Sequence, residues 1–145
     1  MAETRPMSQP AIRVSAMPAD ANAYGDIFGG WLVGQMDLAA GLVAARRAKG
    51  RAVTVAMDGM QFHAPVAVGD EVSVYAEIVS VGRSSMVIAV EAWRRERHGE
   101  AVQKVTQAQF TFVAIDENRK PRAVDVPDPS PLEGEEGARR EAAGG

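Results

Sequence analysis

A single carboxylate, Asp37, interrupts the most apolar stretch of this sequence. It is the only charged residue between Gly29 and Ala45. A helix that is apolar on all sides is buried, and an ionised carboxylate there is costly unless it is paired, hydrogen-bonded or used in chemistry. Asp37 is therefore the first candidate for a general base, or for a nucleophile that attacks directly. The competing interpretation is a structural carboxylate that backbone groups or an arginine satisfy.

A glycine-rich segment leads into the helix that we predict around Asp37. Gly29 and Gly30 follow a polar stretch that contains Asn22. The first N–H groups of a helix have no acceptor within the helix, and the helix dipole adds positive potential there. The N–H groups of Gly29, Gly30 and Trp31 would therefore be open to a carbonyl oxygen, as an oxyanion site requires. Asn22 is alternatively a turn residue in a left-handed conformation.

A second polar group, Arg83-Ser84-Ser85, follows a glycine in a predicted turn between two strands. A guanidinium group, hydroxyl groups and backbone N–H groups together suit phosphate oxygens. An arginine in a hairpin turn is otherwise simply solvated. Lys104 is a weaker candidate for the same phosphates. His63 and His98 are the only histidines and lack the spacing of metal ligands, so we predict no metal site.

Composition excludes several classes of protein. The chain has 145 residues, 46% of them apolar and 24% charged, which suits one soluble domain. Its net charge of −3 gives no indication of a nucleic-acid partner. The absence of cysteine excludes disulfides and thiolate nucleophiles and is consistent with a reducing compartment. Residues 1–10 lack the apolar stretch of a signal peptide, and the apolar helix is too short for a membrane span. We expect a cytoplasmic protein that binds no membrane.

The elements that position these side chains follow from hydrophobic periodicity. The predicted helix begins near Gly29 and ends after Arg46 and Arg47, with Gly50 as the residue that follows its end. Alternating apolar residues predict strands on both sides of it, and turns at Gly69, Gly82 and Gly99 separate the later strands. The predicted strands cover residues 12–17, 52–62, 72–78, 86–93 and 101–115.

One long helix and one antiparallel meander indicate an α+β architecture. Because the helix is apolar all round, we expect a strongly curved sheet to wrap it and a partner subunit to close the open side. We assign residues 1–10 to a flexible arm and 11–120 to the folded domain. Residues 121–145 are rich in Pro, Glu, Gly and Ala, and we predict a disordered tail there.

Several segments in the same order resemble the hotdog-fold acyl-CoA thioesterases. The resemblance is greatest to the bacterial short-chain acyl-CoA thioester hydrolases, which are related to the cytosolic acyl-CoA hydrolases of animals. It extends from about Ile12 to Asn118. The segments that carry it are residues 22–30 followed by 36–37, then 81–85, then 108–116.

The resemblance implies a hotdog fold and hydrolysis of acyl-CoA to a free carboxylic acid and CoA. No separate cofactor is implied, since CoA is part of the substrate. It further implies a homodimer with sheets joined edge to edge, active sites at the dimer interface, and assembly into a hexamer as a trimer of dimers. Asn22 would orient the water or the thioester and would come from the subunit opposite Asp37. Residues 83–85 would contact the nucleotide part of CoA.

Two other functions remain open. A non-catalytic module that binds or senses acyl-CoA could use the same fold, since function belongs to the site rather than to the fold. Such a module would gain nothing from a buried carboxylate beside the thioester, which favours the hydrolase. A hydratase or dehydratase would require a histidine–aspartate pair in a hydratase motif, and the sequence shows none.

Overall fold

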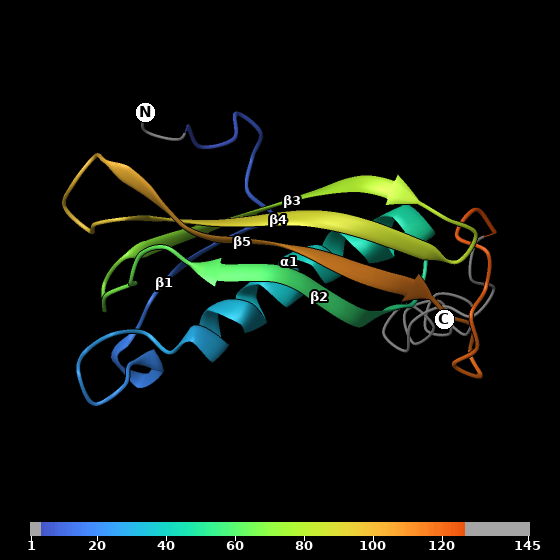
Figure 1. The fold of residues 1–145 in the computed structure, drawn as a ribbon, viewed down its shortest axis with the longest axis horizontal. Coiled ribbons are helices and arrows are strands. Elements are labelled where there is room, and N and C mark those ends of the chain that lie inside the picture. The colour runs from blue at the N-terminus through green and yellow to red at the C-terminus, as the bar shows by residue number, and fades with distance from the viewer. Residues whose placement is uncertain (1–3, 127–145) are drawn as a thin grey trace, which may run out of the picture.

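The computed structural model describes residues 4–126, in which one long helix lies against a five-stranded antiparallel sheet (Figure 1). The α+β prediction is therefore confirmed. The helix α1 covers Gly29–Ala48, and a short 3-10 helix covers Pro18–Asp20. The strands are β1 (Ile12–Ser15), β2 (Ala52–Phe62), β3 (Glu71–Val81), β4 (Ser85–Arg95) and β5 (Val102–Ala114).

The strand order is β1-β3-β4-β5-β2, so only β3, β4 and β5 form a meander. The chain leaves β1 at one edge of the sheet, crosses it as α1, and returns as β2 at the other edge, where β2 pairs with β5. The predicted simple meander is wrong at this point because sequence neighbours β2 and β3 are separated by two strands. One consequence is that β2 is an edge strand.

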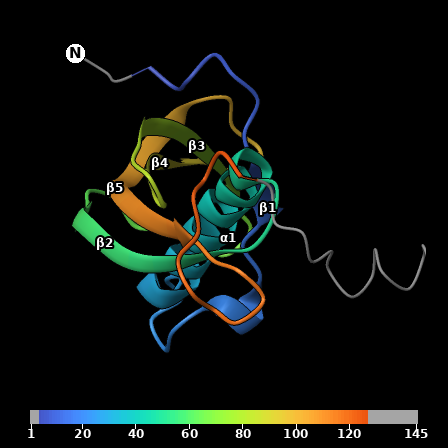
Figure 2. The same ribbon diagram turned by 90° about the vertical axis from the view of Figure 1, so that its right-hand side faces the viewer.

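The sheet bends around α1, as an end-on view shows (Figure 2). The helix buries a face that is mostly alanine, which lets its backbone lie close to the sheet. Leu32 and Met36 belong to the same buried core as Ile88 and Phe110 of the sheet. The opposite face of α1 stays open and carries large apolar side chains. The largest of these are Leu38, 60% exposed, and Leu42, 58% exposed.

The helix ends one residue earlier than Gly50 had indicated. Lys49, not Gly50, takes the left-handed conformation, with φ of 51°. The Gly50 N–H donates to the Ala45 carbonyl at 3.1 Å, which is the 6→1 bond of a Schellman motif. The two arginines in the last turn match the expected complement to the helix dipole. None of the helices in the described region is long and apolar enough to cross a membrane.

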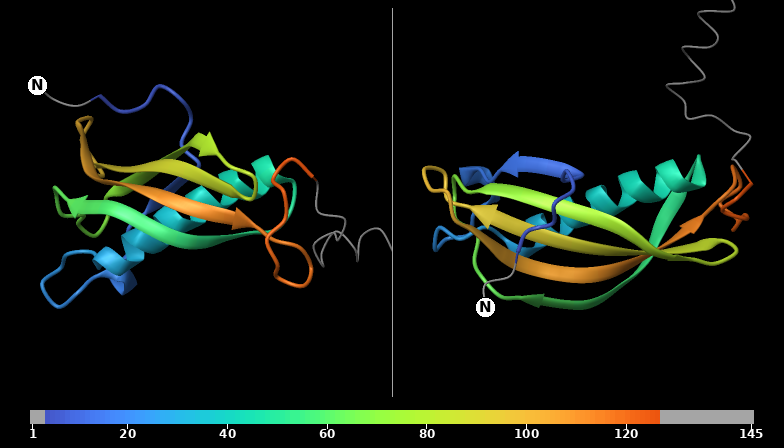
Figure 3. Two further views of the ribbon diagram at one scale, coloured as in Figure 1. Left: turned by 45° about the vertical axis from the view of Figure 1, so that its right-hand side comes forward. Right: turned by 90° about the horizontal axis from the view of Figure 1, so that it is seen from above.

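The predicted disordered tail, which was to begin at residue 121, begins too early. Residues 121–126 pack against the domain, where Arg122 and Val124 are buried. Their order comes from hydrogen bonds to carbonyl groups of other elements, which composition does not reveal. The rest of the predicted tail, residues 127–145, and residues 1–3 of the predicted arm lie outside the described residues. Residues 4–10 form no regular secondary structure and run beside the sheet (Figure 3).

Candidate active site

Asp37 lies midway along α1 and is half-buried. The Thr54 hydroxyl donates a hydrogen bond to Asp37 Oδ1, with the oxygens 2.5 Å apart. No arginine pairs with this carboxylate within residues 4–126, so the structural ion pair that we considered is absent there. One carboxylate oxygen is thus held by a neutral donor, and the other has no hydrogen-bond partner among residues 4–126.

Thr54 reaches the helix from edge strand β2, where the strand is irregular. The register shifts between Thr54 and Ala56, so that Val55 is the extra residue of a β-bulge. A bulge bends its strand and re-aims the side chains beside it. The sequence analysis did not identify Thr54. The available signal was a hydroxyl within the first apolar strand after the helix, but strands carry many such threonines.

The start of α1 offers two backbone donors rather than the three predicted. The Trp31 N–H donates to the Phe28 carbonyl at 3.1 Å and is not open. The Gly29 and Gly30 N–H groups have no acceptor within the described part of the chain. No side chain caps this end of the helix. Both N–H groups are therefore available to an oxygen of a bound molecule.

Asn22 stands at the base of the loop that precedes α1. Its side-chain oxygen accepts hydrogen bonds from the N–H groups of Tyr24, at 2.8 Å, and Asp26, at 3.1 Å. This Asx-turn role agrees with the alternative interpretation, except that Gly25 (φ 85°) takes the left-handed conformation. The Asn22 amide N–H₂ group donates no hydrogen bond to the described residues, so it is available to a ligand.

An apolar cavity of about 390 Å³ adjoins the start of the helix. Gly29 forms part of its wall, and a methyl group added there would stand 3.4 Å from the ring of Phe62. The other lining residues are Ile27, Phe28, Leu32, His63, Ala64, Pro65, Val66 and Val105. The size and lining are those of a small-molecule pocket.

Within one chain these groups do not converge. The helix rises about 1.5 Å per residue, which places Asp37 about 12 Å along the axis from Gly29. A thioester carbonyl held at the Gly29 and Gly30 N–H groups would be out of reach of the Asp37 carboxylate of the same chain. The carboxylate and the N–H donors can act on one bond only if a second chain brings them together.

The predicted phosphate-binding turn is tightly held. The Arg83 carbonyl accepts from the Val124 N–H, and the Ser84 carbonyl accepts from the Ala114 N–H, both at 2.8 Å. The Ser85 carbonyl accepts from the Gly82 N–H, also at 2.8 Å. The Arg83 guanidinium is exposed and has no partner among the described residues.

Lys104 does not join Arg83 within one chain. It is opposite Trp93 at the far end of the β4–β5 ladder, whereas the turn is next to Ser85, opposite Val113. At about 3.3 Å per residue, the two positions on β5 are about 30 Å apart. The Lys104 ammonium instead pairs with Glu91, at 2.9 Å.

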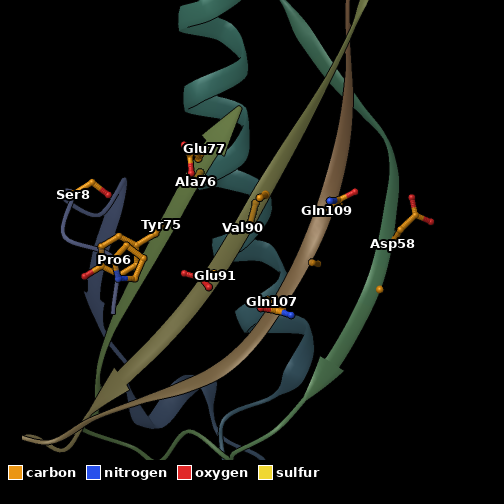
Figure 4. A pocket seen from close by; sticks show the side chains of 13 residues that line it. Pro6, Ser8, Asp58, Tyr75, Ala76, Glu77, Val90, Glu91, Gln107 and Gln109 are labelled. Carbon is orange, nitrogen blue, oxygen red and sulfur yellow. The ribbon is translucent and has the colours of Figure 1, made fainter. Parts of the chain in front are cut away.

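A larger cavity, of about 480 Å³, lies on the face of the sheet away from α1 (Figure 4). It contains none of the predicted site residues. Its charged lining residues are the acidic Asp58, Glu77 and Glu91, the last of them paired with Lys104, so the lining includes no cationic side chain for the phosphates of CoA. Residues 4–126 contain no cluster of three histidine or carboxylate side chains that could hold a metal ion.

The sequence of this chain matches a known protein family. The thioesterase superfamily model matches residues 24–101. An uncharacterised acyl-CoA thioester hydrolase of Zymomonas mobilis is 62% identical over 116 residues, which cover 80% of this chain and 78% of that protein. The acyl-CoA thioester hydrolase YciA of Escherichia coli is 47% identical over 124 residues, covering 83% and 94%.

Solved structures of thioesterases have a similar fold. The hexameric thioesterase y2039 of Yersinia pestis has a TM-score of 0.80 at 47% identity and covers 84% of this chain and 99% of its own. HI0827, a hexameric broad-specificity acyl-coenzyme A thioesterase, has a TM-score of 0.78 at 40% identity, covering 97% and 93%. The chain therefore belongs to the thioesterase superfamily and has the hotdog fold.

Proposed function

We propose that this chain hydrolyses acyl-CoA thioesters to carboxylic acids and CoA, with Asp37 as the group that activates water. The observation that carries the proposal is the hydrogen bond from Thr54 to Asp37, which fixes one carboxylate oxygen and leaves the other without a partner among residues 4–126 on a half-buried helix face. Relatives named acyl-CoA thioester hydrolases at 47–62% identity support it. The reaction needs water and groups of the protein, with no separate cofactor. A cytoplasmic location remains the prediction from the sequence.

Thioester hydrolysis assigns each group a role. The free Asp37 oxygen accepts a proton from a water molecule as that water attacks the carbonyl carbon. The negative oxygen of the tetrahedral intermediate accepts hydrogen bonds from the Gly29 and Gly30 N–H groups, and the Asn22 amide orients the thioester. Collapse of the intermediate breaks the C–S bond, and the departing CoA sulfur takes up the proton. Direct attack by Asp37 to give an anhydride would use the same groups.

We propose that each site is shared by two chains. The open face of α1 exposes Leu38 and Leu42, and the neighbouring edge strand β2 exposes Val55 and Met57. An edge strand with apolar side chains is a ready template for pairing with another chain. A two-fold axis at this edge would set Asp37 opposite the partner's helix start. The hexameric neighbours support assembly of such dimers into a trimer of dimers.

The acyl end and the nucleotide end of the substrate would bind at two different surfaces. The apolar cavity next to Gly29 suits the acyl chain, because it begins where the thioester carbonyl would be held. The exposed Arg83 guanidinium, with the Ser84 and Ser85 hydroxyls, suits the phosphates of the nucleotide. Lys104 could contribute to the same phosphates only from another subunit.

The experiment is a thiol-release assay with a series of acyl-CoA substrates, comparing wild type with Asp37→Ala and Asp37→Asn. Loss of a positioned general base typically lowers the rate about 10²–10⁴-fold. Asp58→Asn, which removes an exposed carboxylate from the far face of β2, is the matched control and should keep full activity. Wild type that binds acyl-CoA without releasing CoA would support the binding module instead. Full activity of both Asp37 variants would refute the assigned role.

A further inference from the structure

The segment after β5 connects the end of that strand with the end of α1 and with the turn between β3 and β4. This C-terminal strap, residues 115–126, folds back so that Ile115 bridges with Pro121. Its residue Val124 is 2% exposed and belongs to the hydrophobic core. The Val124 N–H reaches the Arg83 carbonyl at 2.8 Å. The strap therefore connects the end of β5 to the turn that carries Arg83.

Arg122 anchors the strap at the end of α1. It is 9% exposed, and its guanidinium donates to the carbonyl groups of Ala48, at 2.9 Å, and Ile115, at 3.0 Å, and also to that of Val126. No carboxylate pairs with it within the described residues. Its charge is instead satisfied by carbonyl oxygens, one of them at the negative end of the helix dipole. A buried charge bound in this way has few alternative positions.

The strap also completes the turn. Three successive carbonyls, those of Arg83, Ser84 and Ser85, accept hydrogen bonds, and the strap supplies the one on Arg83 itself. The Arg83 backbone is therefore fixed while its guanidinium stays exposed. Fixing a binding group before the ligand arrives lowers the entropy that binding must overcome.

We propose that the C-terminal strap is a positioning element for the nucleotide end of the substrate, acting through Arg83. The inference rests on the proposed contact between Arg83 and the CoA phosphates. It goes further by assigning a binding role to Arg122 and Val124, which do not face the ligand. Loosening the strap should weaken binding of the nucleotide part and leave the chemistry at the thioester unchanged.

The test compares KM for an acyl-CoA with KM for the same acyl group on N-acetylcysteamine, which lacks the nucleotide. Arg83→Ala should raise KM for the acyl-CoA about tenfold and leave KM for the short thioester unchanged. Arg122→Met, which keeps the volume and removes the donors, should shift the two KM values in the same pattern, with kcat on the short thioester preserved. Arg46→Met, which removes an exposed arginine of the last turn of α1 with no partner among the described residues, is the matched control and should change neither value.

The double variant Arg83→Ala/Arg122→Met should show no further rise in KM over Arg83→Ala, since both changes act on one contact. Equal effects of Arg122→Met on both substrates, or full additivity with Arg83→Ala, would overturn the role of the strap and leave the proposed contact between Arg83 and the phosphates in place. If Arg83→Ala leaves the KM ratio unchanged, the proposed phosphate contact is wrong and the inference falls with it. Val124→Ala, which loosens the packing and keeps the N–H, gives the same readout if Arg122→Met does not fold.

Discussion

Replacing Thr54 by valine would test how Asp37 is held. The change removes one hydroxyl at nearly constant volume and leaves Asp37 Oδ1 without its hydrogen bond. The oxygen–oxygen distance of 2.5 Å lies within the range of a hydroxyl that donates to a carboxylate. Hydrogen bonds to charged groups contribute about 1.5–3 kcal/mol. Because this bond holds the carboxylate where it must meet the attacking water, we expect its loss to appear in the transition state. At about 1.4 kcal/mol per factor of ten, Thr54→Val should then lower kcat/KM by about 10- to 150-fold.

The assay is thiol release under kcat/KM conditions, with folding checked by urea unfolding. Thr54→Ser keeps the hydroxyl and should retain activity within about threefold. Thr111→Val removes another half-buried strand hydroxyl, which has no side-chain partner among the described residues, and should be neutral. In an Asp37→Asn background, Thr54→Val should cost little more, because the two residues act as a unit. An active Thr54→Val enzyme, or a full additional loss in the Asp37→Asn background, would show that Thr54 does not act through Asp37.

Three further predictions concern assembly, specificity and acid stability. Leu42→Glu places a charge on the open face of α1 and should yield smaller species in sedimentation velocity together with loss of thiol release; an active monomer would contradict shared sites. Phe62→Ala removes a wall of the apolar cavity and should move the kcat/KM maximum to longer acyl chains, each buried methylene being worth about 0.8 kcal/mol. The hydrogen bond from Arg95 lowers the pKa of Glu71 below its ordinary value of 4.5, so its carboxylate stabilises the fold above that pH and loses the effect as pH falls through the lowered pKa. In urea titrations, the unfolding free energy of Glu71→Gln should therefore fall less between pH 5 and pH 3 than that of wild type. The difference should be no more than about 1 kcal/mol because the pair is partly exposed, and an equal fall in both proteins would contradict the prediction.

Local sequence patterns were sufficient for the elements and for part of the site. Period-2 alternation and glycine turns gave β3, β4 and β5 close to their observed bounds, because these signals depend on neighbours in the chain. The glycine start of α1 and the lone Asp37 marked the candidate chemistry for the same reason. The resemblance, which depends on ordered motifs, indicated the hotdog fold that the solved neighbours confirm.

Tertiary structure alone decided how distant segments meet. Thr54 reaches Asp37 because β2 lies at the sheet edge beside α1 and is bulged at Val55. A local sequence pattern predicts neither which strands pair nor in which register. The ends of the long β4–β5 ladder separate Lys104 from Arg83 within one chain. Arg122 lies in a stretch whose composition is typical of a tail. Its order comes from carbonyl groups of Ala48 and Ile115, which only the folded chain brings within hydrogen-bonding distance.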